Sequence, residues 1–329
     1  MKKIKILCTV GPSTLNEDSL KKLEEEKVNL LRINLSHTLL EDVEKNIRLI
    51  QQYVSIPICI DSEGAQLRSG YLKEGMRLLQ EGEVITIPDD LPLNHPHLLS
   101  EIPLGELLYV DFHAACMEVI EKSDGFLRCR VVVGGKVGSN KAMNLAKREI
   151  FLPALTQKDK EAILIAKKLG VRHVALSFAN CPEDVLEMRQ VAGDDFFLIS
   201  KIESNRGLKN LEAICKLSDA LLLDRGDLSR EQPIQRIPFW QKKIVAIVKQ
   251  LQKEVYVATN LLESMIHEKI PTRAEVSDVA NALLDGVDGL VLAAETAIGN
   301  NPVLCVRMVR EIINEYQGIE SLDWKKYWR

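Results

Sequence analysis

The chain has 329 residues, 46% of them hydrophobic, and carries 43 basic and 47 acidic side chains for a net charge of −4. This balance excludes a general electrostatic surface for nucleic acid or anionic lipid, and an aromatic content of only 5% argues against base stacking. Seven cysteines without a Cys-x-x-Cys pair favour buried, reduced thiols, and the lack of a long apolar segment favours a cytoplasmic protein that contacts neither membrane nor nucleic acid.

The first 70 residues alternate between apolar strands and amphipathic helices. Strands are predicted at 4–10, 28–35 and 56–60, and helices at 17–26 and 40–53. After residue 70 the pattern changes to short β-rich runs that are separated by turn signals and not interrupted by a long helix. We therefore predict a small all-β domain at 71–151, inserted after the third strand.

The alternation returns at residue 152 and continues to residue 318. Further strands are predicted at 173–178, 196–203, 220–227, 254–259 and 289–296, with helices between them and a last helix at 302–316. Eight strands that alternate with helices predict an α/β fold, a (β/α)8 TIM barrel formed by residues 1–70 and 152–318. Residues 319–329 are predicted to be a C-terminal tail.

Polar side chains occur where the predicted barrel strands end, which is where the active sites of such barrels lie. They are Arg32, Asp61, Ser177, Lys201, Glu203, Asp227, Thr259 and Glu295. Lys201 and Glu203 lie two residues apart and so point to the same side of a strand, and Asp227 is predicted to end the next strand. Two carboxylates suit Mg²⁺, and a lysine beside them suits a phosphate or a developing enolate. An ordinary ion-pair cluster is the alternative explanation.

Several motifs together resemble the pyruvate kinase family, over about residues 3 to 316. They are 8–13 (CTVGPS), 32–37 (RINLSH), 202–203 (IE), 225–228 (RGDL), 258–259 (AT), 262–266 (LESMI), 271–275 (PTRAE), 277–282 (SDVANA) and 284–286 (LDG). The inserted all-β domain resembles the mobile lid domain of that family. The resemblance implies phosphoryl transfer between phosphoenolpyruvate and ADP, which gives pyruvate and ATP.

The resemblance also implies roles for single residues. Glu203 and Asp227 would hold Mg²⁺ or Mn²⁺, and Lys201 would stabilise the transferring phosphoryl group and the enolate. Arg32 would contact the phosphate, and Thr259 would lie near the carbon that is protonated. The backbone amides of Gly226 and Asp227 would receive the substrate carboxylate at a helix start.

Further residues match binding sites for other ligands in the family. A monovalent-cation site, with K⁺ as the candidate ion, is implied for Asn34, Ser36, Asp61 and Ser62. Nucleotide contacts are implied for Asn34, Ser36, His37, Arg68 and Lys141.

The chain departs from the family pattern after the third strand. The family carries Asp-Thr-Lys-Gly-Pro-Glu-Ile-Arg there, whereas residues 61–68 read Asp-Ser-Glu-Gly-Ala-Gln-Leu-Arg. Glu63 therefore stands in place of a lysine, and Gln66 in place of a glutamate associated with potassium dependence. We expect Glu63 to face the site and to weaken the binding of phosphates. The family's C-terminal regulatory domain has no counterpart in the sequence, so we expect a short form that is a monomer or a homodimer.

Two other functions remain open at this point. The same metal and lysine pocket could stabilise an enolate during decarboxylation or C–C cleavage of an oxoacid, without a nucleotide. Glu63 favours this second function, whereas Arg68 and Lys141 favour the kinase. The third is a non-catalytic sensor of an oxoacid or enol phosphate, which the joint presence of Lys201 and Glu203 argues against.

Overall fold

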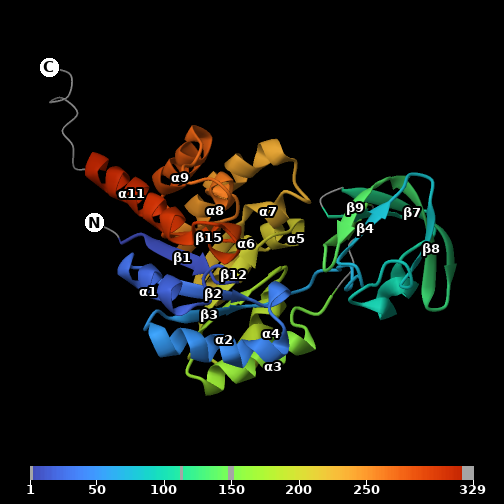
Figure 1. The fold of residues 1–329 in the computed structure, drawn as a ribbon, viewed down its shortest axis with the longest axis horizontal. Helices are drawn as coiled ribbons and strands as arrows, with labels where there is room; N and C mark the ends of the chain where they lie inside the picture. The colour runs from blue at the N-terminus through green and yellow to red at the C-terminus, as the bar shows by residue number, and fades with distance from the viewer. Residues whose placement is uncertain (1–2, 112–113, 147–151, 321–329) are drawn as a thin grey trace. The chain divides into compact units, whose positions relative to one another are not determined.

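The computed structural model describes residues 3–111, 114–146 and 152–320 (Figure 1). The chain divides into two compact units, which we call the barrel unit (Met1–Gly64 with Ala154–Arg329) and the lid unit (Ala65–Pro153). Of the predicted tail, residues 321–329 lie outside the described residues.

The barrel unit is a closed parallel barrel, which confirms the predicted TIM barrel. Its strands are arranged in the order β1-β15-β14-β13-β12-β11-β3-β2. They are β1 (Lys5–Thr9), β2 (Leu30–Asn34), β3 (Ile58–Asp61), β11 (His173–Leu176), β12 (Phe197–Ile202), β13 (Ala220–Asp224), β14 (Glu254–Ala258) and β15 (Gly289–Leu292). The barrel closes where β1 pairs in parallel with β15, with Lys5 opposite Gly289.

Helices surround this barrel (Figure 1). They are α1 (Glu17–Glu25), α2 (Leu40–Tyr53), α3 (Gln157–Lys168), α4 (Pro182–Ala192), α5 (Asn205–Lys209), α6 (Leu211–Leu217), α7 (Arg225–Leu228), α8 (Ile237–Gln250), α9 (Arg273–Asp285), α10 (Ala294–Ala297) and α11 (Pro302–Glu320). Short 3-10 turns are η1 (Leu35–His37), η3 (Ile234–Arg236) and η4 (Glu263–Ile266). Side chains fix where the helices begin, because Asn16, Thr156 and Thr272 accept hydrogen bonds from the first turns of α1, α3 and α9. None of the helices in the described part combines the length and the apolar character needed to cross a membrane.

Two apolar layers hold the barrel unit together. The larger cluster includes Ile6, Cys8, Leu31 and Ile33 of the strands together with buried residues of the surrounding helices. A smaller cluster comes from the alternate strand positions, which line the inside of the barrel. It consists of Leu7, Leu30, Cys59, Ala175, Ile199, Ala220, Leu222, Tyr256, Ala258 and Val291.

The lid unit consists of antiparallel β-sheets, which confirms the predicted all-β insertion after β3. One sheet has the order β10-β6-β7-β8-β5, and β4 pairs with β9. The strands are β4 (Met76–Leu79), β5 (Val84–Ile87), β6 (Leu107–Val110), β7 (Ala115–Ser123), β8 (Phe126–Val133), β9 (Gly135–Gly138) and β10 (Met143–Leu145), and η2 (Pro96–Glu101) is a 3-10 turn. The unit has its own apolar core, which includes Ile85, Leu108, Val119 and Leu127.

Two barrel strands end at least three residues earlier than predicted. β13 stops at Asp224 instead of residue 227, and β15 stops at Leu292 instead of residue 296. In the first case the side chain of Asp224 accepts the backbone N–H of Asp227, and this cap turns the chain into α7. The predicted strand end at Asp227 is therefore wrong, and Asp227 lies in the first turn of a short helix.

Candidate active site

The polar residues at the carboxyl end of the barrel continue the inward-facing positions of the core. Since side chains alternate along a strand, the residue two positions after an inward-facing apolar residue also faces inward. The pairs of core and polar residue are Leu30 and Arg32, Cys59 and Asp61, Ile199 and Lys201, and Leu222 and Asp224. The strands thus bring two cations and two carboxylates together above the apolar interior.

Lys201 lies at the centre of this group. Its Nζ atom is 2.9 Å from Oε1 of Glu203, 3.5 Å from Oδ2 of Asp61 and 3.9 Å from Oδ2 of Asp224. It also donates to Oγ of Ser177 at 3.0 Å. Burial opposes the charge of Lys201, but the carboxylates of Asp61, Glu203 and Asp224 raise its pKa above the ordinary value, so it remains a cation.

Arg32 shares the Asp61 carboxylate with Lys201. Nη1 of Arg32 lies 3.3 Å from Oδ2 of Asp61, and Nε of Arg32 donates to Oγ1 of Thr9 at 3.0 Å. Arg32, Asp61 and Lys201 are all buried. The predicted contact residues Arg32 and Lys201 are therefore held in one ion-pair network that is shielded from solvent.

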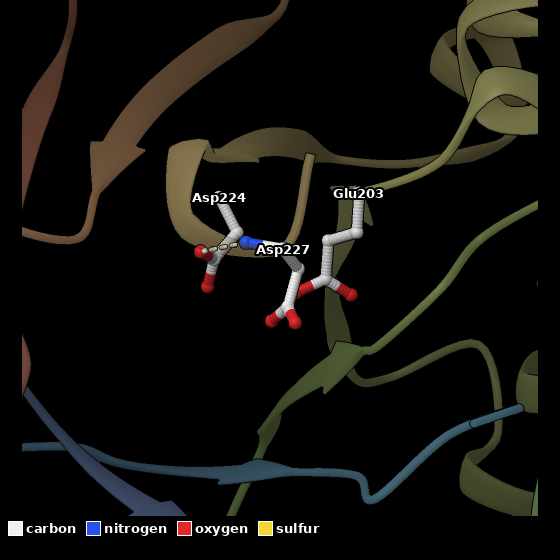
Figure 2. Close-up of side chains that lie close together, drawn as sticks. All are labelled: Glu203, Asp224 and Asp227. Carbon is white, nitrogen blue, oxygen red and sulfur yellow. Dashed lines mark hydrogen bonds between the residues drawn. The ribbon is translucent and has the colours of Figure 1, made fainter. Parts of the chain in front are cut away.

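Glu203, Asp224 and Asp227 form a cluster of three carboxylates, each with an oxygen atom within 4.8 Å of the others (Figure 2). The structure brings Glu203 and Asp227 together as predicted, with their carboxylates close to one another in Figure 2. The pKa of Glu203 is raised to about 8, mainly by burial and also by the neighbouring Asp227 and Asp224, against the opposing effect of Lys201. Three carboxylates with oxygen atoms this close together fit a hard divalent cation such as Mg²⁺ or Mn²⁺.

Asp224 is the site residue that sequence reasoning missed. Its Oδ1 atom accepts a hydrogen bond from Oγ1 of Thr259 at 2.5 Å and one from the backbone N–H of Asp227 at 3.4 Å (Figure 2 shows the second). The apolar run before Asp224 predicts that this aspartate belongs to the strand at 220–227. The signal that would have found Asp224 is its position two residues after Leu222, on the inward face.

Thr259 follows β14 and is held against the turn after β13. Its backbone adopts a φ of 76°, in the left-handed region that threonine rarely occupies. A Cβ atom on Gly226 would lie only 2.7 Å from Cγ2 of Thr259, so the absence of a side chain at Gly226 permits this close approach. The structure thus brings the predicted residues Gly226, Asp227 and Thr259 side by side.

The residues predicted for a monovalent cation lie at the ends of β2 and β3. Asn34 pairs with Asp61 across the two strands, and Oδ1 of Asn34 accepts the N–H of Ser36 at 2.9 Å. Oγ of Ser62 accepts the N–H of Ser177 at 2.9 Å. Asn34 and Asp61 are therefore neighbours, and Ser36 and His37 follow directly in η1.

Arg68 and Lys141, the other predicted nucleotide contacts, belong to the lid unit. Arg68 forms an antiparallel bridge with Ala142, and its Nη1 donates to the carbonyl of Asn140 at 3.2 Å. Nζ of Lys141 lies 3.2 Å from Oδ2 of Asp111. The structure therefore places the two basic residues on adjacent segments of the lid unit.

Glu63 carries a partner that the sequence did not indicate. Its Oε1 atom lies 2.8 Å from Nζ of Lys158, which also donates to the carbonyl of Leu35 at 2.6 Å. The negative charge of Glu63, which we expected to weaken the binding of phosphates, is therefore paired within the barrel unit.

Ser177 and Glu295 were the remaining polar residues at predicted strand ends. Ser177 joins the network, since its Oγ donates to Oδ1 of Asp61 at 3.3 Å and accepts from Lys201. Glu295 instead accepts the backbone N–H groups of Leu262 and Ala293, so its carboxylate fixes the loops that follow β14 and β15.

Comparison with known proteins agrees with this geometry. Residues 1–306 match the family described as pyruvate kinase, barrel domain. A pyruvate kinase of Thermotoga maritima is 36% identical over 96% of this chain and 71% of its own length. Pyruvate kinases of Staphylococcus haemolyticus and Bacillus licheniformis are 32% and 34% identical over 99% of this chain, which spans 58% and 59% of their lengths. This protein therefore belongs to the pyruvate kinase family.

Proposed function

We propose that this chain catalyses Mg²⁺-dependent phosphoryl transfer between phosphoenolpyruvate and ADP, giving pyruvate and ATP. The observation that carries the proposal is the buried, protonated Lys201, whose Nζ lies 2.9 Å from Glu203 beside the cluster of three carboxylates. Phosphoryl transfer needs positioned positive charge more than covalent chemistry, and a shielded lysine next to a cation site supplies it.

Each residue of the proposed site has a distinct task. Lys201 would donate its N–H groups to the oxygen atoms of the phosphoryl group and of the enolate. Arg32 would hold the phosphate, and Thr259 would lie near the carbon that takes up a proton. A divalent cation held by Glu203 and Asp227 would neutralise the negative charge that collects on these oxygens. Burial of Lys201 and Arg32 keeps water away from their charges, which strengthens both interactions.

The proposed binding of the nucleotide and of K⁺ rests on the resemblance to the pyruvate kinase family. We propose Asn34, Ser36 and His37 as nucleotide contacts of the barrel unit. For the lid unit, taken by itself, we propose Arg68 and Lys141. A K⁺ site would use Asn34, Ser36, Asp61 and Ser62. The neighbouring positions of Asn34 and Asp61 on β2 and β3 support the second assignment.

The test is a coupled assay that follows pyruvate formation from phosphoenolpyruvate and ADP, with Mg²⁺ and K⁺ varied. We expect turnover that depends on Mg²⁺ and falls by about a thousandfold or more in Lys201→Met. Lys209→Met, which removes a lysine from α5, serves as the control and should keep wild-type turnover. A wild-type protein that forms no pyruvate would contradict the proposal.

Enolate chemistry on an oxoacid without a nucleotide is the second candidate. It is favoured by the ion pair of Lys141 with Asp111, which occupies a proposed nucleotide contact within the lid unit. Release of CO2 or cleavage of oxaloacetate in the presence of Mg²⁺ alone, without ADP or ATP, would identify this activity.

A further inference from the structure

Asp224 lies inside the proposed site but has no task in the proposed reaction. Its side chain accepts hydrogen bonds from Oγ1 of Thr259 and the backbone N–H of Asp227, and its Oδ2 atom is 3.9 Å from Nζ of Lys201. These three donors are among those proposed for the substrate. The chain therefore presents its own carboxylate to groups that would otherwise be available to an anionic ligand.

The surroundings hold this carboxylate in place. Although burial opposes its charge, Lys201 and the hydroxyl of Thr259 lower the pKa of Asp224, so it stays ionised. Asp224 is only 8% exposed and pairs with Ala258 in the register of β13 and β14, which brings Thr259 beside it. Gly226 also lies close to Thr259, since a Cβ atom on Gly226 would be only 2.7 Å from Cγ2 of Thr259. The carboxylate is therefore a fixed part of the site wall.

The net charge of the site also depends on Asp224. Arg32 and Lys201 pair with the carboxylates of the site, and Nη1 of Arg230 lies 3.1 Å from Oδ1 of Asp227. With a divalent cation, the three cationic side chains and the four ionised carboxylates would carry one net positive charge, and removal of Asp224 would raise it to two. A more positive site binds anions more tightly, and the effect is strong where water is excluded.

We propose that Asp224 is a specificity-determining residue that lowers the affinity of the site for ligands with a carboxylate next to Thr259. The binding of ligands with a neutral amide at that position is weakened less, because these ligands lack the negative charge that Asp224 repels. The inference rests on the proposed function, since it takes Lys201, Glu203 and Asp227 to form the substrate and metal site.

The test compares oxalate with oxamate, its analogue in which an amide replaces one carboxylate, by calorimetry in the presence of Mn²⁺. Asp224→Asn keeps the shape of the side chain and removes its charge, and Asp224→Ala removes both. We expect oxalate to bind about tenfold more tightly to each variant, whereas oxamate changes by less than about threefold. Glu254→Gln removes a charge from the opposite end of β14 and should leave both affinities unchanged.

The ratio of the two affinities does not depend on the fraction of folded protein, which guards against damage to the fold. An unchanged ratio of oxalate to oxamate affinity in both Asp224 variants would overturn the inference. A complete lack of oxalate binding to both variants would overturn it too. A loss of affinity for Mn²⁺ alone by tenfold or more, without a gain for oxalate, would make Asp224 a metal ligand and also overturn it. Failure of the proposed function would be seen separately, as a lack of pyruvate formation while the oxalate ratio still shifts.

Discussion

Nζ of Lys158 lies 2.8 Å from Oε1 of Glu63, and both side chains are about three-quarters buried. The same Nζ atom donates to the carbonyl of Leu35, at the start of η1. Lys158 therefore connects the segment after β3 with the segment proposed to contact the nucleotide, and it compensates the acidic residue that stands where the family has a lysine.

Compensation by Lys158 predicts that the charge of Glu63 has little influence on phosphate ligands. We expect Glu63→Gln to change the affinity for ADP with Mg²⁺ by less than about threefold. Lys158→Gln leaves Glu63 without its cationic partner and should lower the affinity for ADP by about tenfold. Calorimetric titration measures both affinities, and Lys160→Gln, two positions along α3, is the matched control. Much tighter binding of ADP to Glu63→Gln would show that Glu63 repels the nucleotide in spite of Lys158.

Removal of Asp227 should abolish the divalent-cation site and leave the barrel folded. We expect Asp227→Ala to lower the affinity for Mn²⁺ by about a hundredfold or more, because the ion loses one of its carboxylates. Asp18→Ala removes an exposed carboxylate from α1 and should bind Mn²⁺ as the wild type does. Electron paramagnetic resonance counts free Mn²⁺ directly, and unchanged binding to Asp227→Ala would refute the assignment.

The raised pKa of Glu203 predicts how cation binding depends on pH. Burial, with Asp227 and Asp224 nearby, raises this pKa from 4.5 to about 8 in the absence of metal. A cation needs the ionised carboxylate, so the affinity for Mn²⁺ should rise about tenfold per pH unit up to about pH 8 and then level off.

The raised pKa of Glu203 also predicts how the stability of the fold depends on pH. The folded metal-free protein keeps the proton on Glu203 that the unfolded chain releases, so its stability should fall as the pH rises from 4.5 to about 8. Saturating Mn²⁺ should reduce this loss of stability, and Glu203→Gln should remove the part of the loss that comes from Glu203. Thermal unfolding across this pH range gives the measurement, and equal slopes for wild type and Glu203→Gln would contradict the shift.

The contact between Gly226 and Thr259 predicts a rescue experiment. Gly226→Ala places a Cβ atom 2.7 Å from Cγ2 of Thr259, and we expect it to lower the free energy of unfolding by about 1–3 kcal/mol. Thr259→Ser keeps the hydroxyl and removes Cγ2, so the double variant should recover most of the loss. Urea denaturation measures the three variants, and strictly additive effects would show that the two side chains do not clash.

The sequence alone predicted the barrel because its strands are long apolar runs that alternate with amphipathic helices. Helix α2 has the predicted bounds, Leu40–Tyr53, since its apolar spacing is regular. The strand ends were harder to predict. Asp224 continues the inward-facing series of Leu222 but also caps α7, and local sequence does not show that the cap takes precedence over the strand.

Contacts between segments far apart in the chain account for what the sequence missed. The pairing of Glu63 with Lys158 joins residues 95 positions apart, and the bond from Thr259 to Asp224 spans 35. Neither leaves a periodic signal in one sequence. The site residues near Lys201 could be predicted because barrel geometry collects the ends of all strands at one place.

The parallel pairing of β1 with β15 has a consequence for biosynthesis. Lys5 lies opposite Gly289, so the first barrel strand to leave the ribosome finds one of its two neighbours only after almost the whole barrel has been made. Until then the edge of β1 that later faces β15 keeps unpaired backbone groups, which makes the nascent chain susceptible to wrong strand pairing. The lid unit, whose strands pair within Ala65–Pro153, is free of this delay and can assemble while the barrel is still open.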